Sequence, residues 1–277
     1  MRVSVVQMNP SADKAANLAA AERLVSAAVA EDRPDLVVLP EMWTCLGGDG
    51  DTKRAAAERL PDPPGATSGG EAYRLLRDLA RRHRIVLHGG SMAEDGGERL
   101  YNTTVVFGPD GEERARYRKI HLFDIVAPDG TGYRESATFG RGSGIVTYRA
   151  GDTTVGCTIC YDLRFPELYL ALRRAGAELI VVPAAFTLQT GKDHWEVLLR
   201  ARAIETQCWI AAAATWGRHQ ERNETRFTYG HSLIADPWGH VVAKASDGEG
   251  WATARLDHRL TARVRRDMPL MDHRVLA

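Results

Sequence analysis

Three residues whose side chains can together carry out nucleophilic hydrolysis each follow or end an apolar, strand-like run. Glu41 follows "LVVLP", Lys119 lies in "YRKIHLFD", and Cys160 ends "TVGCTIC". The attacking species of a cysteine is the thiolate, but the thiol has a pKa of roughly 8.5 and is mostly protonated at neutral pH. A carboxylate can accept that proton, and an ammonium can stabilise the oxyanion that develops on an attacked carbonyl. The set therefore predicts cysteine-dependent hydrolysis.

Each of these residues alone has a plainer interpretation. A cysteine at a strand end is usually small core filler, and a glutamate after a proline often begins a loop or caps a helix. The lysine in "RYRKIH" would ordinarily be a solvated surface cation. Their occurrence together favours the catalytic interpretation over three separate structural roles.

Cys160 also belongs to a C-x-x-C pattern with Cys157, which elsewhere indicates zinc or redox chemistry. A structural zinc site needs four ligands, and neither a second cysteine pair nor H-E-x-x-H is present. In an extended strand, residues three apart point to opposite faces, so the two thiols are not expected to share an ion or a disulfide. We expect no metal site, and the chain carries no P-loop and no G-x-S-x-G serine motif.

The three residues are spaced along an alternation of apolar strands and amphipathic helices, which is the α/β pattern. Beyond the carboxyl ends of such strands, functional groups gather. A single domain covering residues 1–277 is expected, with internal pseudo-symmetry between its halves. Strands are predicted at 2–8, 35–41, 84–92, 101–120 (with a turn at "GPDGE", 108–112, between extended segments), 152–160, 178–186, 208–216, 229–246 and 250–257, and helices at 12–31, 71–83, 166–177 and 193–207.

The helical periodicity places apolar side chains on one face of each predicted helix. In the helix at 12–31 that face carries Leu18, Ala21, Val25 and Ala28. In the helix at 193–207 it carries Val197, Ala201 and Ile204.

The charge balance argues against nucleic acid or an anionic membrane surface as a partner. Lys plus Arg and Asp plus Glu both number 36, and non-specific attraction to polyanions requires an excess of cations. No apolar run is long enough to cross a bilayer. With four cysteines and no signal-like start, we expect a cytoplasmic, soluble protein without disulfides.

Three segments resemble the signature segments of the nitrilase superfamily of carbon–nitrogen hydrolases. They are "LVVLPEMW", "YRKIHLFD" and "TICYDLRFPELYLALRRAGAELIVVPAAF", and they keep the order Glu, Lys, Cys. The resemblance runs nearly the whole chain. "TGKDHWEVLLRARAIETQCWIAAAA", "YGHSLIADPWG" and "MPLMDHR" look closest to the Nit branch, and within it more to deaminated glutathione amidases than to ω-amidases.

The resemblance implies a role for each matching residue. Cys160 would be the nucleophile, Glu41 the general base and Lys119 the oxyanion stabiliser. Glu135 in "YRESATFG" matches the family's second glutamate, which helps to position the catalytic groups. The backbone N–H of Tyr161 would complete the oxyanion hole.

The resemblance also implies a four-layer αββα sandwich, with neither a metal nor an organic cofactor. It implies a homodimer or a higher homo-oligomer, paired through helices next to the active site, and the tail at 258–277 is expected at that interface. The Gly- and Asp-rich loop at 124–134 departs from the usual "D-x-x-x-P-G" linker, which bears on substrate choice more than on catalysis.

The implied substrate is a small amide, either deaminated glutathione or a related α-keto acid ω-amide such as α-ketoglutaramate. A nitrile, an N-carbamoyl amino acid and an aliphatic amide are alternatives within the superfamily, and an inactive binding scaffold is the non-enzymatic alternative. Arg164 has two interpretations: a guanidinium that binds a substrate carboxylate, or the partner of Asp162 or Glu167 in an ion pair.

Overall fold

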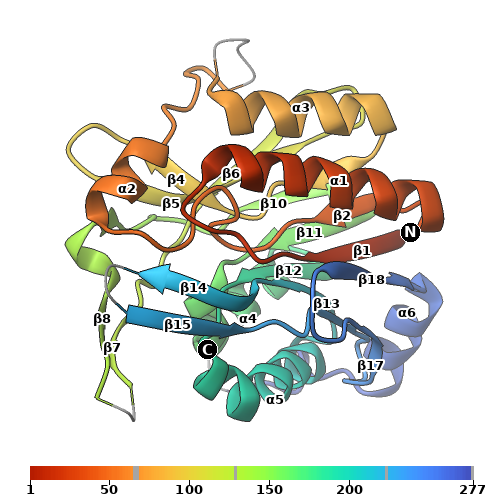
Figure 1. Cartoon of the computed structure of the whole chain (residues 1–277). Coiled ribbons are helices and arrows are strands. Elements are labelled where there is room, and N and C mark those ends of the chain that lie inside the picture. Colours follow the sequence, from red (N-terminus) through yellow and green to blue (C-terminus); the bar gives the residue numbers. More distant parts are fainter. Residues whose placement is uncertain (65–68, 128–129, 222–223, 276–277) are drawn as a thin grey trace.

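The two large β-sheets of the protein lie face to face between two layers of helices. The computed structural model describes residues 1–64, 69–127, 130–221 and 224–275. Helices α1 (Lys14–Asp32) and α3 (Glu71–His83) cover one outer face, and α4 (Pro166–Arg174) and α5 (Leu188–Thr206) cover the other (Figure 1). The predicted αββα sandwich is confirmed.

The first sheet is built on three parallel strands, β1, β2 and β3, which are connected through α1 and α3. Its main order is β18-β1-β2-β3-β5-β4, with β6 and β9 also paired to β5. The strand bounds are β1 Arg2–Gln7, β2 Leu36–Val38, β3 Val86–His88, β4 Met92–Asp95, β5 Leu100–Phe107, β6 Glu113–Arg118, β9 Phe139–Gly140 and β18 Gly250–Arg255.

The second sheet repeats this plan. Its order is β10-β11-β12-β13-β16-β17, and the parallel strands β11, β12 and β13 are connected through α4 and α5. In both sheets an antiparallel strand flanks each side of the parallel trio, which accounts for the pseudo-symmetry predicted from the strand–helix order. The bounds are β10 Thr147–Ala150, β11 Thr153–Cys157, β12 Leu179–Ala184, β13 Trp209–Ala214, β16 Leu233–Ala235 and β17 Val241–Lys244.

The central strands are mostly apolar because both of their faces are buried. In β1, Val3 and Val5 join the core between the two sheets, whereas Val6 joins the core beneath α1 and α3. Residues of β2 divide in the same way. Successive side chains of a strand point to opposite faces, so a strand in an inner layer favours apolar residues on both faces, and a polar residue there, such as Ser4 or Gln7, is hydrogen-bonded.

The predicted apolar faces of the helices have different surroundings. In α1, Ala21, Val25 and Ala28 are buried as expected. In α5 the predicted face points outward instead, since Val197 is 67% exposed and Ile204 is 45% exposed. The helix packs through a different set of buried residues: Trp195, Leu199, Arg202, Ala203 and Thr206.

The structure contains elements that the sequence patterns did not predict. They include helix α2 (Gly50–Ala56) and two hairpins, β7–β8 (Asp124–Val126 and Gly132–Arg134) and β14–β15 (Trp216–Glu221 and Glu224–Tyr229). The basic segment after β18 forms α6 (His258–Asp267). Within the described residues, no helix is long and apolar enough to span a membrane.

Candidate active site

Cys160 lies in a tight turn rather than on a strand, which corrects the predicted strand at 152–160. β11 ends at Cys157, and Cys160 opens a short 3-10 helix that runs to Arg164. Its φ of 47° is in the left-handed region, where a residue with a Cβ is uncommon and which occurs disproportionately at active sites. The prediction that Cys157 and Cys160 point to opposite faces of one strand therefore does not apply. The two thiols nevertheless form no disulfide, since all four cysteines are free.

Asp162 connects this turn by hydrogen bonds to the segment around Lys119. Its buried carboxylate accepts hydrogen bonds from Tyr117 Oη at 2.7 Å, His121 Nδ1 at 2.7 Å and the His121 backbone N–H at 3.1 Å. It also accepts from the N–H of Ile159 at 2.8 Å. Asp162 thus joins the residues that flank Lys119 to the residue that precedes Cys160.

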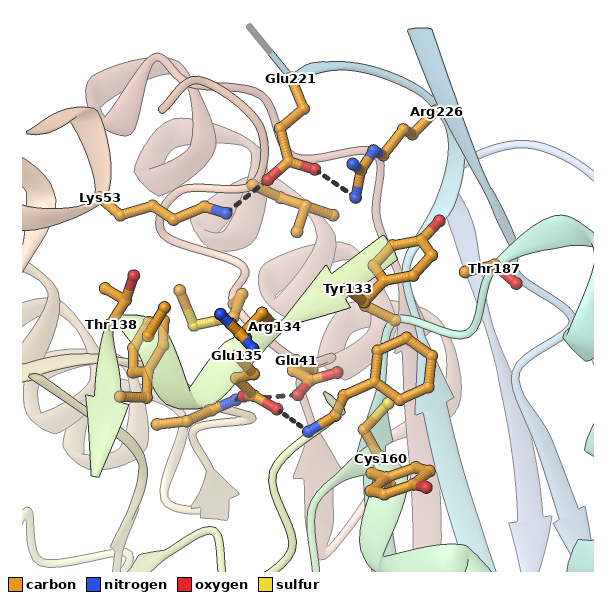
Figure 2. A pocket seen from close by; sticks show the side chains of 18 of the residues that line it. Glu41, Lys53, Tyr133, Arg134, Glu135, Thr138, Cys160, Thr187, Glu221 and Arg226 are labelled. Carbon is orange, nitrogen blue, oxygen red and sulfur yellow. Dashed lines mark hydrogen bonds and ion pairs between the residues drawn. The ribbon is translucent and has the colours of Figure 1, made fainter. Parts of the chain in front are cut away.

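Three charged side chains meet at the floor of the pocket, and Figure 2 shows two of them, Glu41 and Glu135, near Cys160. Lys119 Nζ lies 2.9 Å from Glu41 Oε1 and 2.9 Å from Glu135 Oε2. Lys119 is 2% exposed, and the side chains of Glu41 and Glu135 are 5% and 14% exposed. One buried ammonium is therefore held between two carboxylates.

Asn102 and Phe123 hold this group in place. The Asn102 amide donates to Glu41 Oε1 at 2.9 Å and to Glu135 Oε1 at 3.2 Å, and the Phe123 N–H donates to Glu135 Oε2 at 2.7 Å. Asn102 lies beside Lys119, whose N–H donates to its carbonyl. Sequence reasoning missed Asn102, because a single asparagine inside an apolar strand carries no motif.

Burial and charge set the protonation states at the floor. Burial, followed by the negative charge of Glu41, raises the pKa of the Cys160 thiol well above its usual range. The thiol is therefore protonated at neutral pH, with the Glu41 carboxylate as its neighbouring base. For Lys119, burial opposes the charged form, but the Glu135 and Glu41 carboxylates outweigh it and raise the pKa of Lys119. The arrangement supplies a thiol beside a base and a permanent cation.

These groups open into a cavity of about 720 Å³, within the range of small-molecule sites. The two unpredicted hairpins supply Gly132, Tyr133 and Arg226 to its lining, and α2 supplies Lys53. The end of the 124–134 segment, Gly132 to Arg134, thus forms part of the pocket wall; residues 128–129 lie outside the described part of the chain.

Tyr161 and Arg164 both line the cavity. The Tyr161 ring makes an edge contact with Phe123. The Arg164 guanidinium lies 3.4 Å from His194 Nδ1 and 5.4 Å from the centre of the Phe186 ring. Among the described residues it forms no ion pair, so the predicted alternative of a pair with Asp162 or Glu167 is wrong.

The structure thus brings Glu41, Lys119, Glu135 and Cys160 together, with Tyr161 and Arg164 on the cavity lining. In the part of the chain that the structure describes, no group of three or more His, Cys, Asp or Glu side chains is arranged to hold a metal ion. The arrangement can perform acyl transfer through a thioester, in which the thiol is the nucleophile, a carboxylate is the base, and an ammonium faces the developing oxyanion.

Comparison with known proteins agrees with this geometry. The sequence model of the carbon-nitrogen hydrolase family matches residues 2–266. The deaminated glutathione amidase of Synechocystis sp. is 41% identical over 277 residues, covering 98% of this chain and 97% of the relative. The ω-amidase of Danio rerio is 38% identical over 275 residues, covering 99% and 94%.

Among solved structures, the C. elegans NitFhit protein superimposes with a TM-score of 0.89 at 36% identity. The match covers 99% of this chain and 65% of the NitFhit chain, so about a third of NitFhit has no counterpart here. Both the sequence and the fold comparisons extend over nearly the whole chain. The chain therefore belongs to the carbon-nitrogen hydrolase family and is an amidase.

Proposed function

We propose that this amidase hydrolyses the ω-amide bond of an α-keto acid, with deaminated glutathione as its first substrate. The observation that carries the proposal is the convergence of Cys160, Glu41 and Lys119, with Glu135, at the floor of one cavity. The choice of substrate is supported by the Synechocystis relative, whose name gives deaminated glutathione as its substrate.

The acylation half of the reaction begins with the protonated Cys160 thiol and the neighbouring Glu41 carboxylate. Glu41 takes the thiol proton as Sγ attacks the amide carbon. Lys119 and the Tyr161 N–H stabilise the tetrahedral oxyanion, and Glu135 keeps Lys119 in its charged form. Protonated Glu41 then delivers its proton to the departing nitrogen, so the amine leaves neutral and a thioester remains.

The deacylation half uses the same carboxylate. Glu41 accepts a proton from water as the oxygen attacks the thioester carbon, and Lys119 again faces the oxyanion. Collapse of the tetrahedral species expels the Cys160 thiolate, which regains the proton from Glu41. The products are the keto acid and the amine, and each group returns to its starting state.

Arg164 is proposed to bind the carboxylate of the keto-acid portion. Arg164 belongs to the turn that also carries Cys160, and its guanidinium lines the cavity. Because it forms no ion pair among the described residues, it can donate two hydrogen bonds to a substrate carboxylate. We expect Arg164→Lys to raise KM for carboxylated amides far more than for neutral ones. Equal changes for both kinds of substrate would contradict this role.

Formation of the acid product from a substrate panel tests the proposed function. Deaminated glutathione and α-ketoglutaramate both yield α-ketoglutarate, which a coupled assay with glutamate dehydrogenase detects, while an N-carbamoyl amino acid and an aliphatic nitrile are followed by ammonia release. The highest kcat/KM is expected for deaminated glutathione. Turnover confined to the carbamoyl compound or the nitrile would replace the proposal, and no turnover of any compound by the folded protein would favour a binding scaffold.

A second candidate is ω-amidase activity on α-ketoglutaramate itself. The observation that favours it is the 38% identity to the Danio rerio ω-amidase over nearly the same length. The same panel separates the two, because an ω-amidase would prefer the short amide.

We further propose a homodimer, one domain spanning residues 1–277, and a cytoplasmic location. The exposed apolar side chains of Val197 and Ile204 on α5 support an interface between two copies. The tail at 258–277 is proposed to take part in it, although residues 276–277 lie outside the described chain. A reducing compartment suits a free thiol nucleophile.

A further inference from the structure

A second group of charges lies at the rim of the same cavity, away from the catalytic floor. Glu221 Oε1 lies 2.7 Å from Lys53 Nζ, and Glu221 Oε2 lies 2.9 Å from Arg226 Nη1. Figure 2 shows these three side chains together on one side of the pocket, with Glu41, Glu135 and Cys160 on the other. We call Lys53, Glu221 and Arg226 the rim cluster.

The two cations of the rim cluster retain unused hydrogen-bond donors. An ammonium has three N–H donors and a guanidinium five. In the described structure, Glu221 is the partner of Lys53, and Arg226 uses Nη1 on Glu221 and Nη2 on the largely exposed Glu224 at 3.2 Å. Arg226 Nε is buried and finds no hydrogen-bond partner among the described residues, so the donors open to a ligand are the remaining N–H groups of its two Nη atoms and of Lys53 Nζ. The rim cluster can therefore donate to one further anionic group.

Tyr133 fixes the orientation of Arg226, because the guanidinium carbon lies 4.5 Å from the centre of the Tyr133 ring. Both Tyr133 and Arg226 line the cavity, as does Lys53. The side chains of Lys53 and Arg226 are 22% and 25% exposed, so their donors are partly shielded from solvent. A partly shielded, pre-oriented cation pair is suited to binding a carboxylate.

The size of the cavity bears on which carboxylate this is. A cavity of about 720 Å³ is in the range that encloses most of a drug-sized ligand, and α-ketoglutaramate would occupy a small part of it. Deaminated glutathione carries one carboxylate on the keto-acid side of the scissile amide and another at the end of the leaving amine. With the amide carbon at Cys160, the two ends extend in different directions.

We propose that Lys53 and Arg226 form a leaving-group subsite that binds a carboxylate at the far end of the substrate's amine portion. This inference rests on the proposed function and deepens it, because it makes a substrate with two separated carboxylates the preferred class. Glu221 holds the two cations at the rim, and the bound carboxylate takes the donors that Glu221 leaves unused.

The test compares two substrates that differ in one charge: deaminated glutathione and its glycinamide, in which the terminal carboxylate is an amide. Lys53→Met and Arg226→Met are expected to raise KM for the acid at least tenfold, which is the loss of one charge-assisted hydrogen bond. KM for the glycinamide and for α-ketoglutaramate should stay within about twofold of the wild-type value. The matched control is Lys244→Met, which breaks the exposed ion pair with Glu196 elsewhere on the surface and should change no KM.

An equal rise of KM for the acid and the glycinamide would overturn the subsite and show that the rim cluster merely ties α2 to the β14–β15 hairpin. A binding measurement separates this from failure of the proposed function. In a Cys160→Ala background, calorimetry gives Kd for the intact acid and the glycinamide. Tighter binding of the acid that depends on Lys53 and Arg226 supports the subsite even where the wild-type protein hydrolyses neither compound. Equal Kd values refute it.

Discussion

The floor and the rim of the cavity hold the same kinds of charge in opposite arrangements. At the floor, the cation Lys119 lies between two carboxylates, Glu41 and Glu135, whereas at the rim the carboxylate Glu221 lies between two cations. The floor side chains are 2–14% exposed, and those of the rim cluster are 22–26% exposed. Charges interact more strongly where water is excluded, so the floor is the more tightly coupled group.

This difference separates chemistry from selection. The floor carries an excess negative charge beside a protonated thiol, which suits proton transfer and the stabilisation of an oxyanion. At the rim, Lys53 and Arg226 have N–H donors that no described protein group uses, which suits recognition of an anion. Substitutions at the floor should therefore change kcat, and substitutions at the rim should change KM.

The largest effect is expected from Cys160→Ala. Loss of the nucleophile should lower kcat by at least about 10⁴-fold, as it does in hydrolases that act through covalent intermediates. Cys157→Ala is the matched control, because Cys157 is a fully buried core residue at the end of β11. It should retain activity while losing some stability. Steady-state kinetics and circular dichroism on both variants measure this, and equal loss of activity in both would contradict the assignment of the nucleophile.

Lys119→Met should have the next largest effect. It removes an oxyanion donor, which costs about 10²–10³-fold in kcat. It also leaves Glu41 and Glu135 facing each other without a buried cation, which should cost about 3–5 kcal/mol of unfolding free energy. Urea denaturation and kcat measure the two losses. A variant that loses activity but has the unfolding free energy of the wild type would contradict the inference that the charges at the floor are more tightly coupled than those at the rim.

Asp162→Asn should have a smaller effect on catalysis. An amide accepts fewer hydrogen bonds than a carboxylate, so the Cys160 turn loses part of its attachment to the Lys119 segment. We expect kcat to fall about 10–100-fold with KM within threefold, because misplacement of reacting groups by a fraction of an ångström affects the transition state. Tyr117→Phe, which removes one donor, should lie between this variant and the wild type. A rise in KM at unchanged kcat would place Asp162 in substrate binding.

The sequence predicted the residues of the floor but not what holds them. Glu41, Lys119 and Cys160 follow strand-like runs, so the α/β pattern and the motifs together placed them at one end of the sheets. The left-handed turn at Cys160 and its attachment through Asp162 depend on partners about 40 residues away in sequence. No local pattern records such pairings.

The rim was not predicted because its elements have little hydrophobic periodicity. The β14–β15 hairpin carries His219, Gln220, Arg226 and other polar residues, which do not alternate with apolar ones as a half-buried strand would. The outward face of α5 shows a second limit of sequence patterns. Periodicity identified an apolar face at Val197 and Ile204, but it does not specify what covers that face.

A buried ionisable group outside any charge network should respond to pH differently from the floor. His88 on β3 is fully buried, and neither ring nitrogen has a hydrogen-bond partner in the described chain. Burial lowers the pKa of His88 to about 3, from about 6.5 in an unfolded chain. The folded state therefore binds fewer protons, so the stability contribution is present above about pH 6.5 and is lost as the pH falls toward 3.

His88→Phe removes the pH-dependent contribution of His88 to the unfolding free energy. Between pH 7.5 and pH 4.5 the wild type should lose about 2–3 kcal/mol of unfolding free energy more than the variant does. Urea denaturation at the two pH values measures the difference, and kcat at pH 7.5 should change little because His88 does not line the cavity. Parallel losses in both proteins would show that the acid sensitivity comes from the carboxylates of the floor instead.

The smallest effect is expected for the stability of the rim. Glu221→Gln removes the carboxylate between Lys53 and Arg226, but both cations remain partly in contact with water and can be hydrated. The unfolding free energy should therefore change by no more than about 1 kcal/mol, the usual range for partly exposed ion pairs. Glu135→Gln at the floor is the matched variant and should cost about 3 kcal/mol, because Lys119 loses a buried partner. Urea denaturation of the two variants compares them directly. Equal costs would mean that the rim is as tightly coupled as the floor, and that burial does not distinguish the group that performs the chemistry from the group that selects the substrate.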